Sequence, residues 1–220
     1  MNRPLLILFA KAPVAGRVKT RLCPPLTPEQ AADLHSCLVQ DMIEMLSIFT
    51  GSADLELSSD SAVDVTEAWP DVTMPRSIQA DGDLGVRIFN ALADALASGR
   101  KMAMVVGSDF PALPSAHIDA LLTSEADVTL GPTLDGGFFA IACRRLHTGI
   151  FDRVRWSTGS TLDDVARSAA QCGLNVARGP AWFDVDVEED LERMLKMSEL
   201  PRHAARWSAN YQKLRAGSSR

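Results

Sequence analysis

The continuous apolar run at residues 4–10, PLLILFA, constrains the fold more than any other feature of the chain. A strand that is apolar at every position must be covered on both faces, which is typical of a parallel sheet between two layers of helices. A loop containing proline and glycine follows over residues 11–26. Thr27, Pro28 and Gln30 then predict the start of a helix, because Thr27 can cap it and Gln30 can complete a capping box. The order strand, loop, helix is the first half of a βαβ unit.

The rest of the chain continues this alternation of strands and helices. The apolar patterns predict further strands at 53–58, 72–78, 101–107, 126–131, 138–143 and 174–178, and helices after residue 28 and around 61–69, 83–98, 115–124, 159–172 and 188–197. We therefore expect an α/β fold with a mostly parallel central sheet, helices on both faces and right-handed crossovers. Residues 1–197 form one domain in this interpretation. Residues 198–220 are rich in arginine and are expected to form a basic surface helix or tail.

Charge and cysteine content limit the classes of function. The net charge of −6 argues against broad nucleic-acid binding, which needs a basic surface, but it leaves room for a local anion site. The four cysteines form no CxxC motif, so free thiols in a reducing compartment are expected. No stretch has the length of an apolar membrane span, and the first cations mostly follow the N-terminal apolar run instead of preceding it. We expect a cytoplasmic protein.

A cluster of cations follows the first predicted strand. Lys11, Arg17, Lys19 and Arg21 lie where ligands bind in open α/β sheets, beyond the carboxyl end of a strand. A helix N-terminus adds free N–H groups and a positive field, so the loop predicts a polyphosphate site. Neither a Walker A motif nor a G-x-G-x-x-G fingerprint is present, since Gly16 is followed by Arg-Val-Lys-Thr. The alternative is that these cations only solvate a surface loop.

Aspartates at predicted strand ends are the candidate metal ligands, because Mg²⁺ is bound by carboxylates together with phosphate oxygens. Asp109 ends the strand at 101–107 and either binds a metal or makes an Asx turn before Pro111. Asp184 and Asp186 are alternate residues of an extended segment, so their carboxylates would point to one side. For Asp186 the alternative is a cap on the following helix.

Other polar residues have weaker assignments. Asp81 and Asp83 precede a helix and are expected to serve in a turn or a cap. Asp135 begins an Asp-Gly-Gly sequence that is either a hairpin turn or a place where a ligand approaches the backbone, with Asp135 contacting an acceptor or a sugar hydroxyl. No Ser–His–Asp set is evident. All four histidines are expected on the surface, away from these motifs, namely His35, His117, His147 and His203.

Five segments taken together carry a family resemblance. In order they are AKAPVAGRVKTRL, GSDFP, GPTLDGGFF, WST and FDVDVEEDL. In this order they resemble a bacterial family provisionally named nucleotide-diphospho-sugar transferases, which is similar to the 2-phospho-lactate guanylyltransferases of coenzyme F420 synthesis. The resemblance covers residues 4–195 and implies a Rossmann-like GT-A-type fold with one antiparallel strand, one bound nucleotide and one divalent metal, Mg²⁺ or Mn²⁺.

The resemblance also implies roles for particular residues. The nucleotide site would comprise Lys11, Ala12, Gly16, Arg17, Lys19, Arg21, Gly85, Arg87 and Ser108. The metal ligands would be Asp109, Asp184 and Asp186. The acceptor site would comprise Asp135, Gly136, Gly137, Trp156, Ser157 and Thr158, and the residues closest to the chemistry would be Lys19, Arg21, Asp109 and Asp135. The chain departs from the family pattern at Val86, at Phe138-Phe139 and at Val187-Glu188, where an acidic residue, tyrosines and Thr-Pro are frequent.

Two reactions fit this set of residues. The first is nucleotidyl transfer from a nucleoside triphosphate to a phosphate or hydroxyl acceptor, with release of pyrophosphate. The second is glycosyl transfer from a nucleotide-sugar, for which Asp135 is the candidate base. The charge of the basic loop favours a triphosphate. A third class is a nucleotide-binding scaffold without activity. In each case the partners are a nucleotide and a small molecule, with no nucleic acid and no membrane span.

Overall fold

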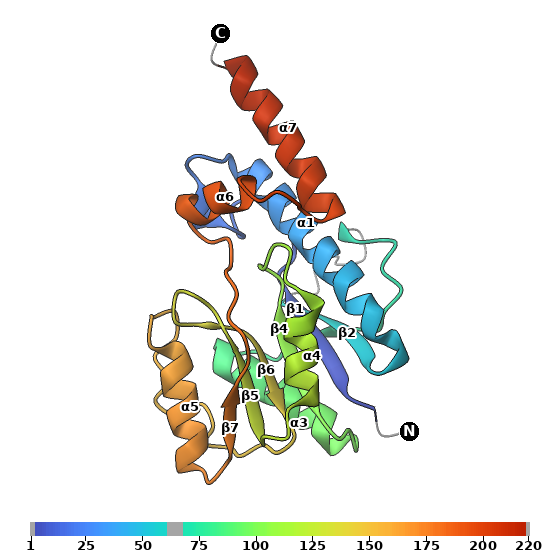
Figure 1. The fold of residues 1–220 in the computed structure, drawn as a ribbon, viewed down its shortest axis with the longest axis vertical. Helices are drawn as coiled ribbons and strands as arrows, with labels where there is room; N and C mark the ends of the chain where they lie inside the picture. The colour runs from blue at the N-terminus through green and yellow to red at the C-terminus, as the bar shows by residue number, and fades with distance from the viewer. Residues whose placement is uncertain (1–2, 61–67, 219–220) are drawn as a thin grey trace.

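The computed structural model describes residues 3–60 and 68–218, and these residues form a sheet flanked by helices (Figure 1). The sheet has seven strands in the order β3-β2-β1-β4-β6-β5-β7. The strands are β1 (Leu5–Ala10), β2 (Asp54–Ser59), β3 (Arg76–Ile78), β4 (Ala103–Gly107), β5 (Val128–Pro132), β6 (Phe138–Cys143) and β7 (Val176–Arg178). Strand β6 runs antiparallel to both β4 and β5, whereas all other pairs are parallel. The mostly parallel sheet and its single antiparallel strand are confirmed.

The helices also follow the predicted alternation. They are α1 (Pro28–Ser47), α3 (Leu84–Ala97), α4 (Ser115–Thr123), α5 (Thr161–Gln171), α6 (Glu188–Leu195) and α7 (Arg202–Ser218). The short helix predicted around 61–69 lies mostly outside the described residues. The strand predicted at 72–78 is wrong in length, since β3 begins only at Arg76, after Pro75, which has no N–H to donate to a neighbouring strand.

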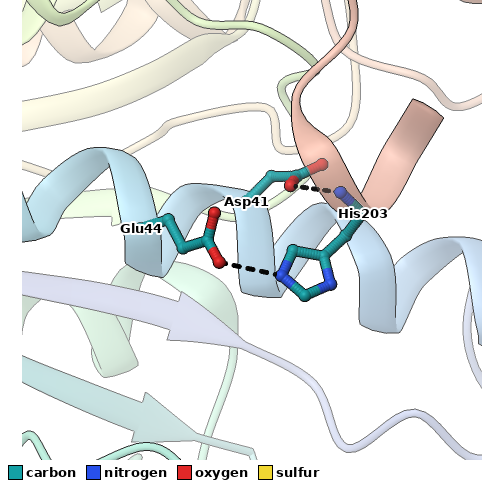
Figure 2. A group of neighbouring side chains, drawn as sticks. All are labelled: Asp41, Glu44 and His203. Carbon is teal, nitrogen blue, oxygen red and sulfur yellow. Dashed lines mark hydrogen bonds and ion pairs between the residues drawn. The ribbon is translucent and has the colours of Figure 1, made fainter. Parts of the chain in front are cut away.

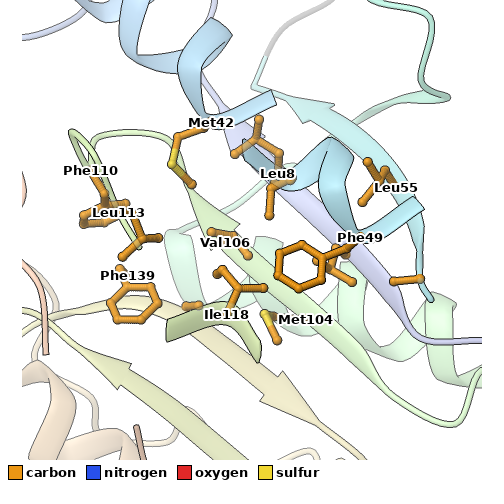
Figure 3. Close-up of a cluster of buried hydrophobic side chains, with 14 of the residues drawn as sticks. Leu8, Met42, Phe49, Leu55, Met104, Val106, Phe110, Leu113, Ile118 and Phe139 are labelled. Carbon is orange, nitrogen blue, oxygen red and sulfur yellow. The ribbon is translucent and has the colours of Figure 1, made fainter. Parts of the chain in front are cut away.

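Burial of β1 on both faces explains the apolar run at residues 4–10. Leu6 and Leu8 pack into a cluster that contains side chains of α1 and α4 (Figure 3). Ile7 and Phe9 face the other way, into a cluster that contains side chains of α3 and α5. Helices therefore cover both faces of the sheet, as the absence of polar positions in this strand predicts.

The beginnings of α1 and α3 are fixed by local hydrogen bonds. The Thr27 hydroxyl accepts from the Gln30 N–H at 3.2 Å, and the Gln30 side chain accepts from the Thr27 N–H at 2.9 Å. This is the predicted capping box. At α3, Asp83 accepts from the Val86 N–H at 2.9 Å, which confirms a capping role for Asp83. Both helices begin just after a loop that leaves the carboxyl end of a parallel strand, so both point their N-termini toward that edge of the sheet.

Helix α7 packs against α1 through its first turns (Figure 1). Ala204, Trp207 and Tyr211 are buried in a cluster with side chains of α1 and α6. Asp41 of α1 accepts hydrogen bonds from the N–H groups of His203 and Ala204 at 2.9 and 2.8 Å, and so caps α7 (Figure 2). The C-terminal helix is therefore tied to the body of the protein through its backbone.

His203 contradicts the expectation of a surface histidine. Its side chain is buried, and its Nε2 lies 3.0 Å from Glu44 Oε1 (Figure 2). Asp41, Glu44 and His203 are the one group of potential metal ligands that lies within 4.8 Å in the described ranges. Because both oxygens of Asp41 already accept backbone N–H groups, the cluster acts as a helix cap. No helix in the described part of the chain is long and apolar enough to cross a membrane.

Candidate active site

A cavity of about 300 Å³ lies where β1 and β4 end at their carboxyl edge. Its walls come from the loop after β1, the start of α3, the loop after β4 and the segment before α6. They include six of the residues predicted for the site, namely Lys11, Lys19, Arg87, Ser108, Asp109 and Asp186. This is the edge at which ligands bind in open α/β sheets. A larger cavity of about 740 Å³ opens beside Leu5 and Asp54, where β1 and β2 begin, and contains none of these residues.

The loop after β1 is built from two tight turns. The Val14 N–H donates to the Ala12 carbonyl at 2.8 Å, and the Arg17 N–H donates to the Val14 carbonyl at 2.9 Å. Gly16 has a φ of +77°, which favours glycine in the second turn. The side chains of Lys11 and Arg17 are exposed, and no carboxylate of the described residues pairs with them. They are free to bind an anion.

Lys19 differs from these exposed cations because its side chain is only 3% exposed. Its Nζ lies 2.7 Å from Asp109 Oδ1 and donates to the Val185 carbonyl at 2.6 Å. The Val185 N–H in turn donates to the Asp109 carbonyl at 3.1 Å. Lys19 therefore joins the loop after β1, the end of β4 and the segment before α6. Its predicted role as a phosphate ligand is not tested by this arrangement.

The carboxylate of Asp109 has an unusual electrostatic setting. Burial by itself would raise the pKa of Asp109, but the Lys19 ammonium and the nearby His35 hold the pKa well below its usual range. Asp109 is therefore ionised under all ordinary conditions. An ionised carboxylate at the end of a parallel strand suits either a metal ion or a buried ammonium, and in this structure it faces the ammonium.

His35 was missed by the sequence reasoning, which placed it on the surface. Its ring is buried, its Nε2 lies 2.9 Å from the Lys11 carbonyl, and its Nδ1 lies 3.4 Å from Asp109 Oδ1. The sequence did contain a signal. His35 precedes Leu38 by three residues and Val39 by four, so it lies on the apolar side of α1. A polar ring on that side must find partners inside the protein.

Arg21 and Asp186 form an ion pair across the site. Arg21 Nη1 donates to Asp186 Oδ2 at 2.7 Å, and both side chains are partly exposed. The idea that Asp186 caps α6 is wrong, since Asp190 reaches back and accepts from the N–H groups of Asp186 and Val187 at 3.1 and 3.0 Å. The Asp186 carboxylate is thus left for contacts within the site.

The carboxylate of Asp184 is half-buried and has a raised pKa. Burial, and then the negative charge of Asp135, raise the pKa of Asp184 to about 6. No ion pair within 4 Å joins Asp184 to a cation in the residues that the structure covers. A half-buried carboxylate in this setting fits a cationic ligand. The carboxylates of Asp109, Asp184 and Asp186 do not form a preassembled group within 4.8 Å among the described residues, so a shared metal would have to draw them closer.

The turn between β5 and β6 is a hairpin closed by Asp135. Its Oδ1 accepts from the Gly137 N–H at 3.0 Å and from the Thr133 hydroxyl. Gly136 has a φ of +90°, and a Cβ at this position would lie 2.1 Å from the Gly159 carbonyl oxygen. The hairpin interpretation of this sequence is confirmed. Gly136 is required because the backbone of a neighbouring turn packs directly against it.

The predicted acceptor residues come together around that neighbouring turn. Trp156 packs on Phe138 and Phe151, with ring centroids 6.3 and 5.6 Å apart. A Cβ on Gly85 would lie 2.8 Å from the Trp156 ring, so Trp156 fills the space beside the start of α3. The Thr158 hydroxyl donates to the Arg155 carbonyl at 2.9 Å and so supports the turn itself, whereas Ser157 is exposed.

Comparison with known proteins places this geometry in a family. Residues 42–158 match the family described as "Uncharacterized protein conserved in bacteria (DUF2064)", and this match covers more than half of the chain. The chain belongs to the DUF2064 family.

Relatives of this DUF2064 protein support the predicted resemblance. It is 27% identical to the 2-phospho-L-lactate guanylyltransferase of Haloarcula marismortui over 191 residues, which cover 85% of each chain. A crystal structure from Desulfovibrio desulfuricans G20, provisionally named a nucleotide-diphospho-sugar transferase, is 28% identical with a TM-score of 0.85 and 98% coverage of both chains. The predicted family resemblance is confirmed.

A more distant structure shows how far the fold itself extends. The 4-diphosphocytidyl-2C-methyl-D-erythritol synthase of Anaerococcus prevotii is 10% identical to the DUF2064 protein, with a TM-score of 0.56 over 88% of this chain and 96% of that chain. At this identity the likeness concerns the fold alone. The two chains therefore share an overall fold despite their low sequence identity.

Proposed function

We propose that this DUF2064 protein is a nucleotidyltransferase that uses a nucleoside triphosphate and a small phosphate or hydroxyl acceptor. The observation that carries the proposal is the pair of cations that line the cavity, Lys11 and Arg87, which have no carboxylate partner in the described ranges. Among the described residues, Arg87 contacts uncharged oxygens, those of the Gly82 carbonyl at 2.9 Å and the Gln79 side chain at 3.5 Å. Guanylyltransferases among the relatives support the same reaction.

The reaction balances without a covalent enzyme intermediate. An acceptor oxygen attacks the α-phosphorus, the new P–O bond forms, and the bond from that phosphorus to the α–β bridging oxygen breaks. Pyrophosphate leaves with the bonding electrons. Lys11, Arg17 and Arg87 would bind the β- and γ-phosphates and stabilise the negative charge that develops there. A phosphate acceptor is already ionised, so the protein needs no general base for it.

A divalent cation, Mg²⁺ or Mn²⁺, fits the oxygen donors of the site. Asp109, Asp184 and Asp186 would hold it, and Asp184 is the ligand that gains most because it has no ion pair within the described residues. When bound, the cation would neutralise charge on the phosphates. Lys19 and Arg21 already compensate Asp109 and Asp186, so these side chains would compete with the metal for the two carboxylates.

The test is an assay of pyrophosphate release. The purified protein is incubated with Mg²⁺ or Mn²⁺, each of the four nucleoside triphosphates and a panel of phosphorylated and hydroxylated acceptors, and pyrophosphate release is measured. We expect release that depends on both the triphosphate and one class of acceptor. Triphosphate binding without acceptor-dependent release under any combination would contradict the proposal and favour a nucleotide-binding scaffold.

Glycosyl transfer from a nucleotide-sugar is the second candidate. The observation that favours it is the likeness to the Desulfovibrio structure, whose name describes that class of enzyme. Its candidate base, Asp135, already accepts two hydrogen bonds through Oδ1 within its own turn, so this oxygen serves the turn. Release of a nucleoside diphosphate from nucleotide-sugars in the same panel, with no pyrophosphate from triphosphates, would decide for this alternative.

A further inference from the structure

We propose that the acceptor carries an aryl or alkyl group without negative charge, and that this group binds in a second cavity beside the first turn of α3. This aromatic cavity has a volume of about 300 Å³ and lies between α3 and residues 148–156, which follow β6. That the bound molecule is the acceptor rests on the proposed function, whereas the preference of the cavity for an apolar group follows from its walls alone. The two can be tested separately.

Aromatic side chains form much of the wall of this cavity. Phe89 lies on α3, and Phe151 and Trp156 lie on the facing segment. All three are half-buried, so each remains partly open to solvent. Trp156 is held by Phe151, with ring centroids 5.6 Å apart, and by the backbone of Gly85, against which its ring packs. Rings fixed in this way suit an apolar group, because covering them removes apolar area from water.

The charged residues at the aromatic cavity disfavour an anionic group. Asp83 and Asp152 line it, and no lysine or arginine of the described residues does. The Asp83 carboxylate already accepts from the Val86 N–H at 2.9 Å, but Asp152 is exposed. Arg155, adjacent in the chain, pairs with Asp164 at 2.8 Å. A carboxylate or phosphate in this cavity would therefore face negative charge without a cationic partner.

The first turn of α3 connects the aromatic cavity with the cavity of the candidate active site. Leu84 and Arg87 line the cavity of the candidate active site, whereas Gly85 and Val86 line the aromatic one. Because these four residues are consecutive and rise about 1.5 Å each along the helix, the two cavities lie on either side of a single turn. The side chains of Leu84 and Val86 are each 44% exposed and give this turn an apolar surface. An acceptor that crosses the turn would cover both.

The two cavities together define the class of acceptor. A phosphate monoester would place its phosphate in the cavity of the candidate active site. One of its anionic oxygens attacks the α-phosphorus, the bond to the α–β bridging oxygen breaks, and pyrophosphate leaves with the bonding electrons. The ester group does not react and would lie in the aromatic cavity. An aryl or alkyl phosphate is therefore favoured over a phosphate whose ester group carries a carboxylate.

The experiment compares acceptors that share a phosphate and differ in the ester group. Pyrophosphate release from GTP and CTP with Mg²⁺ is measured with benzyl, para-carboxybenzyl and methyl phosphate, and calorimetry measures the binding of each acceptor. Thr148→Trp fills the aromatic cavity from an exposed position, and Asp152→Lys replaces its exposed carboxylate with an ammonium. Thr123→Trp and Asp119→Lys are the matched controls, since both residues are exposed on α4 and do not line this cavity.

We expect kcat/KM for benzyl phosphate to exceed that for methyl phosphate by about tenfold, because the ring is removed from water. Thr148→Trp should abolish this advantage and leave methyl phosphate unaffected. Asp152→Lys should raise kcat/KM for para-carboxybenzyl phosphate relative to benzyl phosphate by about fivefold. Both controls should behave as the wild type.

Equal use of methyl and benzyl phosphate by the wild type, or a Thr148→Trp protein that keeps the full preference, would overturn the proposal. If Thr148→Trp does not fold, an Asp152→Lys protein with the wild-type ratio between benzyl and para-carboxybenzyl phosphate would overturn it.

The binding and release measurements separate the aromatic cavity from the reaction. No pyrophosphate release, together with tighter binding of benzyl than of methyl phosphate that Thr148→Trp abolishes, would reject the proposed function and retain the apolar site. Pyrophosphate release with equal kcat/KM for the three acceptors would reject the apolar site and retain the proposed function. Neither release nor a binding preference would reject both.

Discussion

Lys19 is buried against Asp109, with 2.7 Å between Nζ and Oδ1. The two residues differ in burial, since the Lys19 side chain is 3% exposed and the Asp109 side chain is 41% exposed. Losing either partner leaves the other without its counter-charge, but the consequences are unequal. An unpaired ammonium in the interior is costly, whereas an unpaired carboxylate that reaches solvent costs less.

The first prediction follows from this inequality. Asp109→Ala should lower the free energy of unfolding by about 3–5 kcal/mol, because it strands the buried ammonium. Lys19→Met should cost about 1–2 kcal/mol, since Asp109 retains access to water. The double variant should be more stable than Asp109→Ala alone. Urea unfolding at neutral pH measures all three, and an Asp109→Ala protein at least as stable as Lys19→Met would contradict the argument.

The second prediction concerns acid stability. Asp164 is buried and accepts from Arg155 Nε at 2.8 Å and from Arg167 Nη1 at 2.9 Å. Its hydrogen bond with Arg155 holds the pKa of Asp164 well below its usual range, even though burial opposes this. A lowered pKa in the folded state gives stability that is complete above the unfolded pKa of about 4 and is lost as pH falls below it.

Asp164→Asn should therefore lower the melting temperature by several degrees at pH 7, and the difference from wild type should shrink as pH falls below about 4. The matched control is Asp163→Asn, because Asp163 is 59% exposed and pairs with the half-exposed Arg178. Thermal melts between pH 7 and pH 3 measure both variants. A difference that stays constant over this range would mean that the Asp164 ion pairs do not supply the stability.

The third prediction uses two glycines with positive φ. Gly136→Ala should cost more than about 3 kcal/mol, because its Cβ would meet backbone atoms of Gly159 in addition to the strain of a left-handed conformation. Gly16→Ala should cost only about 1 kcal/mol, since nothing lies within 4 Å of the added carbon. Chemical unfolding of the two variants measures the difference. Equal losses would mean that the turns around Gly136 and Gly159 can separate freely.

The fourth prediction concerns the attachment of α7. Asp41→Ala should lower the free energy of unfolding by about 1–2 kcal/mol, because two N–H groups in the first turn of α7 lose their acceptor. Amide exchange over residues 202–211 should increase more than exchange in the sheet. Asp33→Ala is the control, since Asp33 is an exposed aspartate on the same helix. Unchanged exchange in α7 would show that apolar packing alone fixes this helix.

The fifth prediction separates exposed from buried cations. Lys11→Gln and Arg17→Gln should each weaken GTP or CTP binding by about tenfold while the free energy of unfolding stays close to wild type, because neither side chain has a carboxylate partner among the described residues. The affinity loss should be smaller at high salt. Lys101→Gln, an exposed cation just before β4, is the control. Equal affinity of the Lys11 and Arg17 variants and the wild type would remove these cations from the nucleotide site.

Local signals account for most of the fold that the sequence predicts. The run at residues 4–10 and the capping box at Thr27 act over a few residues, so β1 and the start of α1 follow from them directly. The role of Asp186 could not be resolved in this way. Whether the Asp186 carboxylate caps α6 or pairs with another side chain depends on Arg21, which is distant in the sequence.

The position of the candidate site could be predicted from the sequence. The contacts between its side chains could be predicted less well. The rule that ligands bind beyond the carboxyl ends of strands brings the loop after β1 and Asp109 together. It does not say that Lys19 is buried and Arg17 exposed, because this depends on a left-handed backbone at Lys19, where φ is 49°. His35 escaped detection because its partners, Lys11 and Asp109, are supplied by other parts of the fold.

The antiparallel direction of β6 determines where the connection between β5 and β6 lies. Since β6 runs against β4 and β5, the chain leaves β5 at the active edge and re-enters the sheet there, through the turn at 133–137. A parallel β6 would have required a long crossover connection back to the opposite edge of the sheet in place of this short turn. The loop that we propose to contact the acceptor is therefore short and closed on itself. If it does contact the acceptor, substitutions in it would alter which acceptor fits while leaving the loop after β1 untouched.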